Sequence, residues 1–119
     1  MPPVSTGIDI ASVSRISRLS ASPAFLERVF TESERSRRGG EKSYARLLAG
    51  RFAAKEAVMK ALGAGWGRQI GWKDIEVMNS EGRPRARLRA GALKLLGERR
   101  VFLSISCAGD LAVAMAVIE

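Results

Sequence analysis

Three side chains, Asp9, Glu56 and Lys60, have the types and spacing to hold a metal ion and a phosphate group. Asp9 interrupts a short apolar segment between Ile8 and Ile10, directly after a glycine. Magnesium typically takes one or two protein carboxylates and fills its other positions with phosphate oxygens and water. We therefore consider Asp9 and Glu56 as a pair that shares one magnesium ion, with Lys60 as a cation for phosphate.

Each of these residues also has an ordinary structural explanation. Asp9 could cap a helix that begins near Ala11, because aspartate is a favoured N-cap residue. Glu56 and Lys60 are four residues apart, so they could form an ion pair on the solvated side of one helix. Taken separately, the two segments leave both explanations open.

Glu56 and Lys60 must be carried by a long, alanine-rich helix that we predict over residues 43–62, ended by Gly63. At about 100° per residue, one side of this helix collects small residues, one carboxylate and two cations. These residues are Arg46, Ala49, Ala53, Glu56, Lys60 and Gly63. The opposite side is bulky and apolar. We expect the small-residue side to form the floor of a groove, because small side chains let another group approach the backbone closely.

Asp9 must lie on a short strand over residues 5–10, followed by a helix over 11–19. A second helix is expected to begin at Ser22-Pro23, because serine is a good N-cap and proline fits the first helical position. Thr31 and Glu34 have the spacing of a capping box, which predicts a further short helix.

The C-terminal half is dominated by hairpins. The predicted elements are a loop over 37–41, a glycine-rich bend over 63–67, strands over 72–78 and 85–89, a short helix over 91–99, and a hairpin over 101–106 and 111–118. We therefore expect one α+β domain over residues 1–119, with an antiparallel sheet packed against the long helix.

The composition narrows the classes of partner and of chemistry. Twenty Lys and Arg residues against 12 Asp and Glu give a net charge of +8, which favours nucleic acid, phosphorylated small molecules or acidic proteins as partners. With no histidine, imidazole cannot serve as a metal ligand or base. The single cysteine cannot form an internal disulfide. Without an apolar span or a signal peptide, we expect a cytoplasmic protein that does not cross a membrane.

A basic nucleic-acid-binding module is the main alternative from another class. Its support is a row of arginines that alternate along one predicted strand: Arg83, Arg85, Arg87 and Arg89. Binding of single strands also needs stacking aromatic side chains. None of the seven aromatic residues interleaves with this row, so the solvated side of an antiparallel strand explains it better.

Taken together and in order, segments spread over nearly the whole chain resemble holo-acyl-carrier-protein synthase, the short, single-domain branch of the 4′-phosphopantetheinyl transferases. The segments are Gly7-Ile8-Asp9-Ile10, Arg51-Phe52-Ala53-Ala54-Lys55-Glu56-Ala57, Lys60-Ala61-Leu62-Gly63, Asp74-Ile75-Glu76-Val77, Gly82-Arg83-Pro84 and Ser104-Ile105-Ser106. The resemblance implies transfer of 4′-phosphopantetheine from coenzyme A to a serine of an apo acyl carrier protein, with release of adenosine 3′,5′-bisphosphate. Carriers of fatty-acid and of polyketide synthesis are both plausible partners.

The resemblance also implies roles for individual residues. Asp9 and Glu56 match the magnesium-binding acids, and Lys60 matches a lysine near the phosphates. Magnesium and Lys60 would neutralise the developing charge, and Glu56, or a water held by the metal or by a carboxylate, is the best candidate for the base. Gly63 matches a backbone contact with the cofactor.

Further positions concern the adenosine end and the partners. The turn at Arg83-Pro84 matches the segment near adenosine. Arg15 matches a basic position on the helix that receives the carrier, and Arg18, three residues later, shares that side. The family is usually trimeric, with each active site shared between subunits. An apolar row on the last strand, at Leu111, Val113, Met115 and Val117, is surface that such an oligomer would cover.

One departure from the family concerns Cys107, which stands where a histidine usually follows the Ser-Ile-Ser strand. A thiol does not easily replace an imidazole as a hydrogen-bond partner or base. A homologue with reduced or lost activity is therefore an alternative, although the metal ligands are unaffected. Arg51 and Lys55 lie by helical angle on the bulky side of the long helix, where we expect mainly structural ion pairs.

Overall fold

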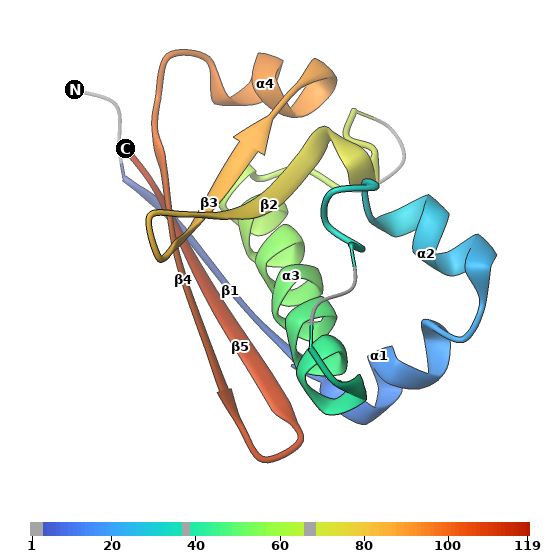
Figure 1. The fold of residues 1–119 in the computed structure, drawn as a ribbon. Coiled ribbons are helices and arrows are strands. Elements are labelled where there is room, and N and C mark those ends of the chain that lie inside the picture. The colour runs from blue at the N-terminus through green and yellow to red at the C-terminus, as the bar shows by residue number, and fades with distance from the viewer. Residues whose placement is uncertain (1–3, 37–38, 66–68) are drawn as a thin grey trace.

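In a computed structural model, the chain forms two antiparallel sheets around one long helix, α3 (Glu41–Leu62) (Figure 1). The structure describes residues 4–36, 39–65 and 69–119. One sheet has the strand order β1 (Ser5–Ser12), β5 (Leu111–Ile118), β4 (Val101–Ala108), and the other pairs β2 (Ile75–Ser80) with β3 (Arg83–Leu88). The predicted α+β class, with antiparallel strands against a long helix, is confirmed.

The remaining elements are short: α1 (Val13–Leu19), α2 (Pro23–Val29), a 3₁₀ turn η1 (Trp72–Asp74) and α4 (Ala90–Leu96). The helix expected from residue 11 begins at Val13, because β1 continues its pairing with β5 up to Ser12. α2 begins as predicted, with Ser22 as N-cap and Pro23 in the first turn. Residues 37–38 of the predicted loop and residues 66–67 of the predicted glycine-rich bend lie outside the described residues.

The short helix predicted from Thr31 is wrong, although its capping box forms. The Thr31 N–H donates to Glu34 Oε1 over 2.8 Å, and the Glu34 N–H donates to Thr31 Oγ1 over 3.2 Å. The chain then makes a turn over residues 32–35 and does not continue as a helix. Since starting a helix fixes several residues for few hydrogen bonds, this local signal alone was insufficient to predict one.

The small-residue side of α3 is covered by the three-stranded sheet, which corrects the expectation of an open groove there. Ala49, Ala53 and Ala57 are fully buried. A Cβ on Gly7 of β1 would lie 2.0 Å from the Ala57 carbonyl oxygen, so the strand lies directly on the helix backbone. Small side chains do permit a close approach, but the group that approaches is β1. β5 continues this layer with its own buried alanines, Ala112, Ala114 and Ala116.

The outer face of the same sheet is apolar and open in the single chain. Ile8 and Ile10 of β1 are 58% and 59% exposed. Leu111 and Met115 of β5 and Phe102 of β4 are also exposed. The pairing register places Ile8 opposite Met115, so these side chains form one continuous surface. None of the helices in the described part of the chain is long and apolar enough to span a membrane.

Candidate functional site

β1 carries Asp9 to the edge of α3 because side chains alternate between the faces of a strand. Ile8 and Ile10 point to the open face, so Gly7 and Asp9 point to the helix. Asp9 Oδ1 lies 3.0 Å from Lys60 Nζ, which also donates to the Ile8 carbonyl over 3.0 Å. The Asp9 side chain is only 18% exposed. The strand therefore presents a mostly buried carboxylate beside a cation of α3.

Asp9 and Glu56 line one hollow of about 320 Å³, together with Arg15 and Phe52. The structure therefore brings the two predicted metal ligands to one place, with a cation at its rim. Asp9 does not cap the helix that follows β1, because the Arg15 N–H donates to Ser12 Oγ. Lys60 pairs with Asp9 of β1, a contact beyond the Glu56–Lys60 pair within one helix that the ordinary explanation supposed.

The donor set of this hollow fits magnesium. No group of three or more Asp, Glu, Cys or His side chains that could hold a metal occurs within residues 4–36, 39–65 and 69–119. A site with two carboxylates therefore leaves the other positions of an ion to be filled by phosphate oxygens and water, as magnesium prefers.

A second hollow, also of about 320 Å³, contains two of the predicted cofactor residues, Pro84 and Cys107. It lies where α3, the β2–β3 hairpin and β4 meet, and Arg46, Arg51 and Asn79 line it as well. Arg46 was expected on the groove side of α3, and Arg51 was expected to be structural. No sequence signal linked them to Pro84 and Cys107, because that proximity depends on how the hairpin packs.

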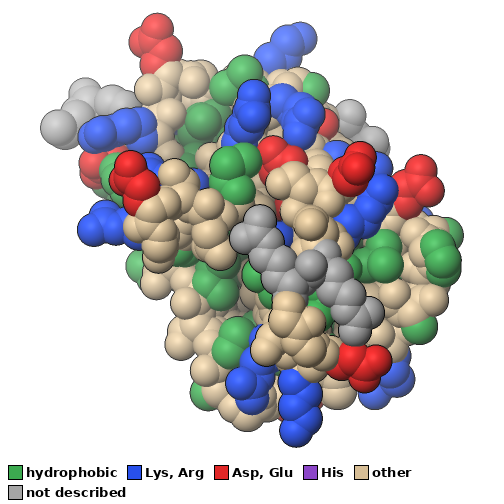
Figure 2. Space-filling view, in the orientation of Figure 1, with side chains coloured by type: hydrophobic (Ala, Val, Ile, Leu, Met, Phe, Trp, Pro, Cys, Tyr) green, Lys and Arg blue, Asp and Glu red, His purple; other side chains and the backbone are tan. Residues whose placement is uncertain are grey.

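The remaining predicted residues lie outside the linings of these two hollows. Gly63 ends α3 with φ 75°, the left-handed conformation that glycine adopts without strain, and its Cα faces open space. Arg83 is exposed at the start of β3. Arg18 is exposed on α1. Figure 2 shows Lys and Arg side chains spread over the visible face, with Asp and Glu side chains between them.

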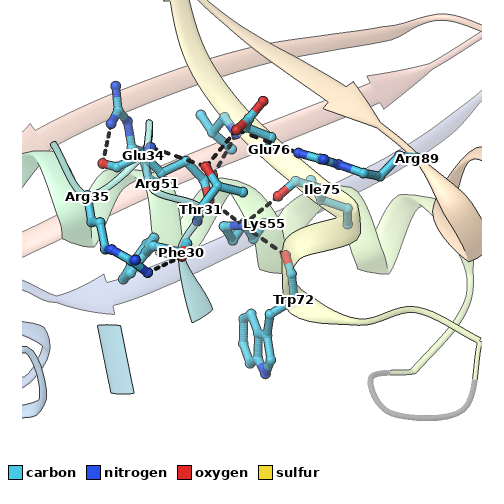
Figure 3. A network of polar contacts seen from close by, with 11 residues as sticks. Phe30, Thr31, Glu34, Arg35, Arg51, Lys55, Trp72, Ile75, Glu76 and Arg89 are labelled. Atoms are coloured by element: carbon cyan, nitrogen blue, oxygen red, sulfur yellow. Dashed lines mark hydrogen bonds and ion pairs between the residues drawn. The ribbon is translucent and has the colours of Figure 1, made fainter. Parts of the chain in front are cut away.

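A buried ion pair joins α3 to the segment that follows α2 (Figure 3). Lys55 Nζ is 2.8 Å from Glu34 Oε1, and both side chains are fully buried. Lys55 also donates to the carbonyl oxygens of Trp72 and Ile75, over 2.8 and 2.5 Å. Burial lowers the pKa of the Lys55 ammonium below its ordinary value, and the Glu34 carboxylate opposes that shift. The expectation of a structural ion pair at Lys55 is confirmed.

The Glu34 carboxylate extends this pair into a network that joins three elements. Its second oxygen, Oε2, accepts the Val77 N–H of β2 over 2.7 Å. Arg51 donates to the Glu34 carbonyl oxygen. Thr31 Oγ1 donates to Glu76 Oε2 over 2.6 Å, and Arg89 lies 3.7 Å from the same oxygen. The network therefore joins α3 to the segment that contains Thr31 and Glu34 and to the β2–β3 hairpin.

Comparison with known proteins gives a consistent result. A sequence model of the 4′-phosphopantetheinyl transferase superfamily matches residues 5–116. A holo-[acyl-carrier-protein] synthase of Geotalea daltonii is 41% identical over 120 residues, covering 96% of each chain. Another, of Myxococcus xanthus, is 43% identical over 118 residues, covering 95% of this chain and 92% of its own length.

A solved structure shows that the likeness extends to the fold. The holo-(acyl-carrier-protein) synthase of Bacillus anthracis, crystallised in complex with CoA (3′,5′-ADP), superposes with a TM-score of 0.80 at 38% identity. The match covers 97% of this chain and 95% of the Bacillus chain.

Proposed function

Because the chain belongs to the 4′-phosphopantetheinyl transferase superfamily, we infer that it acts as a holo-acyl-carrier-protein synthase. It transfers 4′-phosphopantetheine from coenzyme A to a serine of an apo acyl carrier protein and releases adenosine 3′,5′-bisphosphate. The structural observation that carries this proposal is the convergence of Asp9 and Glu56 on one hollow, with Lys60 bonded to Asp9.

In the proposed reaction, the serine hydroxyl of the carrier attacks the pyrophosphate phosphorus that adjoins pantetheine. A bond forms between the serine oxygen and that phosphorus, and the bond from the phosphorus to the bridging oxygen breaks. The leaving group is adenosine 3′,5′-bisphosphate, which keeps the bond's electrons. Glu56, or a water held by a carboxylate, accepts the serine proton.

Asp9 and Glu56 would hold the magnesium ion. When bound, this ion supplies positive charge next to the pyrophosphate oxygens, where negative charge increases during transfer. Lys60 adds a second positive charge at the same place. In the structure the Lys60 ammonium already pairs with the mostly buried Asp9 carboxylate. Without this partner, the carboxylate would lose hydration and gain no interaction in return.

The adenosine end of coenzyme A is proposed to occupy the second hollow, beside Pro84 and Cys107. Arg46 and Arg51 also line that hollow, and guanidinium groups suit phosphate oxygens because they donate two parallel hydrogen bonds. Arg83 is next to Pro84 and adds charge near its entrance. Gly63 is proposed to offer its backbone to the cofactor, since nothing lies within 4 Å of the position that a Cβ there would take.

We also propose a homotrimer whose active sites are shared between subunits. The support is the apolar outer face of the three-stranded sheet, where Ile8, Ile10 and Met115 are each about half exposed. Such a continuous apolar surface marks an interaction site more often than a free surface. Sharing between subunits would allow the two hollows of separate chains to serve one coenzyme A molecule.

One experiment tests the function directly. The protein is incubated with coenzyme A, magnesium and an apo acyl carrier protein, and the carrier is weighed by mass spectrometry. We expect the carrier to gain the mass of one phosphopantetheine group. A carrier whose acceptor serine is replaced by alanine is the matched control and should gain nothing. Carriers of the fatty-acid and polyketide types are compared in parallel, and no gain on any carrier would refute the proposal.

A further inference from the structure

Helix α1 has a weak start of its own. It has seven residues and no acidic residue in its first turn. Helices of this length are unstable alone, because the first turn fixes several residues for few hydrogen bonds. The N–H groups of a first turn also need acceptors from outside the helix. The position of α1 therefore depends on the groups that accept hydrogen bonds from these N–H groups.

Most of the acceptors come from Asp110, at the turn between β4 and β5. Val13 donates its N–H to the Asp110 carbonyl over 2.8 Å, and Ser14 donates its N–H to Asp110 Oδ1 over 2.9 Å. Ser14 Oγ and Ser12 Oγ donate to Asp110 Oδ2 over 2.8 and 2.9 Å. The third N–H, from Arg15, goes to Ser12 Oγ.

The conformation of the β4–β5 turn places Asp110 beside the start of α1. Gly109 adopts φ 56°, the left-handed conformation that favours glycine in a two-residue hairpin turn. Ala108 pairs with Leu111, so Asp110 is fixed at the tip of a continuous ladder. The Asp110 carboxylate also lies at the positive end of the α1 dipole, where a negative charge is stabilising.

We propose that Asp110 is a positioning residue for carrier binding: it fastens α1 to the β4–β5 hairpin and so holds Arg15 and Arg18 in the orientation that receives the acidic carrier. The inference rests on the proposed function. Arg15 lines the hollow that contains Asp9 and Glu56, so a displaced α1 would move the docking side relative to the site.

The negative charge of Asp110 and its proposed positioning role predict opposite effects on carrier binding when the residue is replaced. Asp110 lines a hollow of about 380 Å³ with Glu41, Lys42 and Arg46, and it faces Arg18. A negative charge on this basic side repels an acidic carrier. If Asp110 acted only through its charge, its removal would lower the Michaelis constant for the carrier. If it positions α1, its removal raises that constant.

The test compares Asp110→Asn with a matched control, Glu41→Gln. Both variants remove one negative charge from the same hollow, but the first three N–H groups of α1 donate to Asp110 and Ser12. We expect Asp110→Asn to raise the Michaelis constant for the apo carrier by about two- to fivefold, because an amide nitrogen cannot accept the two serine hydroxyls as Oδ2 does and because the negative charge at the start of α1 is lost. The constant for coenzyme A and the turnover number at saturating carrier should stay unchanged. Glu41→Gln should leave the carrier constant equal or lower.

Hydrogen exchange supplies a readout independent of activity. We expect faster exchange in the segment over residues 12–19 of Asp110→Asn, with unchanged exchange in α3. Provided that the wild-type enzyme transfers, two results for Asp110→Asn would overturn the positioning role. One is an unchanged or lower Michaelis constant for the carrier, and the other is an equal increase in the constants for the carrier and for coenzyme A. A wild-type protein that transfers nothing would instead overturn the proposed function.

Discussion

Replacing Lys55 by methionine tests whether the buried ion pair holds helix α3 in place. The substitution keeps the length and much of the volume of the side chain and removes the ammonium group. Glu34 then stays fully buried without the ammonium that pairs with it, and its carboxylate keeps the N–H groups of Thr31 and Val77 as donors. The carbonyl oxygens of Trp72 and Ile75 lose their bond from Lys55 as well.

The size of the effect follows from this burial. Removing one partner of a buried pair costs about 3–5 kcal/mol, because the other charge is left in a medium of low polarity. For a chain of 119 residues, such a loss lowers the melting temperature by roughly 10–20 °C. The control is Lys60→Met, which removes an ion pair whose lysine is 49% exposed. That pair should contribute at most about 1 kcal/mol.

The assay is urea unfolding followed by circular dichroism, at one protomer concentration because an oligomer makes stability concentration-dependent. We expect Lys55→Met to shift the midpoint strongly with the slope unchanged. Transfer should fall only with the folded fraction, because Lys55 lies in the network of Figure 3 and does not line the hollow that contains Asp9 and Glu56. A Lys55→Met variant no less stable than Lys60→Met would refute the argument that this pair fixes α3.

Four further predictions concern the site and the partners. Glu56→Gln should fold normally and lose magnesium-dependent transfer, and near-normal turnover at limiting magnesium would contradict its role as a ligand. Met115→Arg should convert a wild-type oligomer into a monomer by light scattering, because it places a charge within the apolar outer face; a wild-type monomer at micromolar concentration would contradict the trimer. Arg18→Glu, outside the metal hollow, should raise the Michaelis constant for the carrier and spare that for coenzyme A; the wild-type constant should also worsen from 50 to 300 mM salt, as the Debye length falls to roughly 6 Å. Cys107→His should leave activity equal or higher, by less than the 10²- to 10⁴-fold of full acid–base assistance, whereas loss of transfer in a folded Cys107→Ala would make the thiol a participant.

Local patterns predicted the elements of this chain well, but not what covers them. The periodicity of α3 correctly separated a small-residue side from a bulky one. It could not show that β1 and β5 occupy the small-residue side, because periodicity reports which residues share a side and not their neighbours. Gly7 was the available signal: a glycine within a strand often marks a close approach of another backbone, here that of Ala57.

The residues of the candidate site likewise include some that local sequence patterns predicted and some that they did not. Asp9, Glu56 and Lys60 were predictable because two short segments carry them and their chemistry is recognisable. Arg46 and Arg51 were not linked to Cys107, since their shared hollow needs α3, β4 and the β2–β3 hairpin to meet. The Thr31–Glu34 capping box is a case in which a local prediction was correct but incomplete. Its two local bonds were predicted, but the same carboxylate also binds Lys55 and Val77, and these distant contacts determine its place.

Because side chains alternate between the two faces of β1, the proposed metal site and the proposed subunit contact depend on one another. Ile8 and Ile10 point to the outer face, while Gly7 and Asp9 point to α3. A shift of one residue in the pairing with β5 would exchange the two faces completely. It would place Asp9 on the apolar face and drive a side chain into the position of Gly7, where even a Cβ would lie 2.0 Å from the Ala57 carbonyl oxygen. The close contact at Gly7 therefore fixes the register that places Asp9 in the candidate site and the isoleucines on the face proposed to contact another subunit.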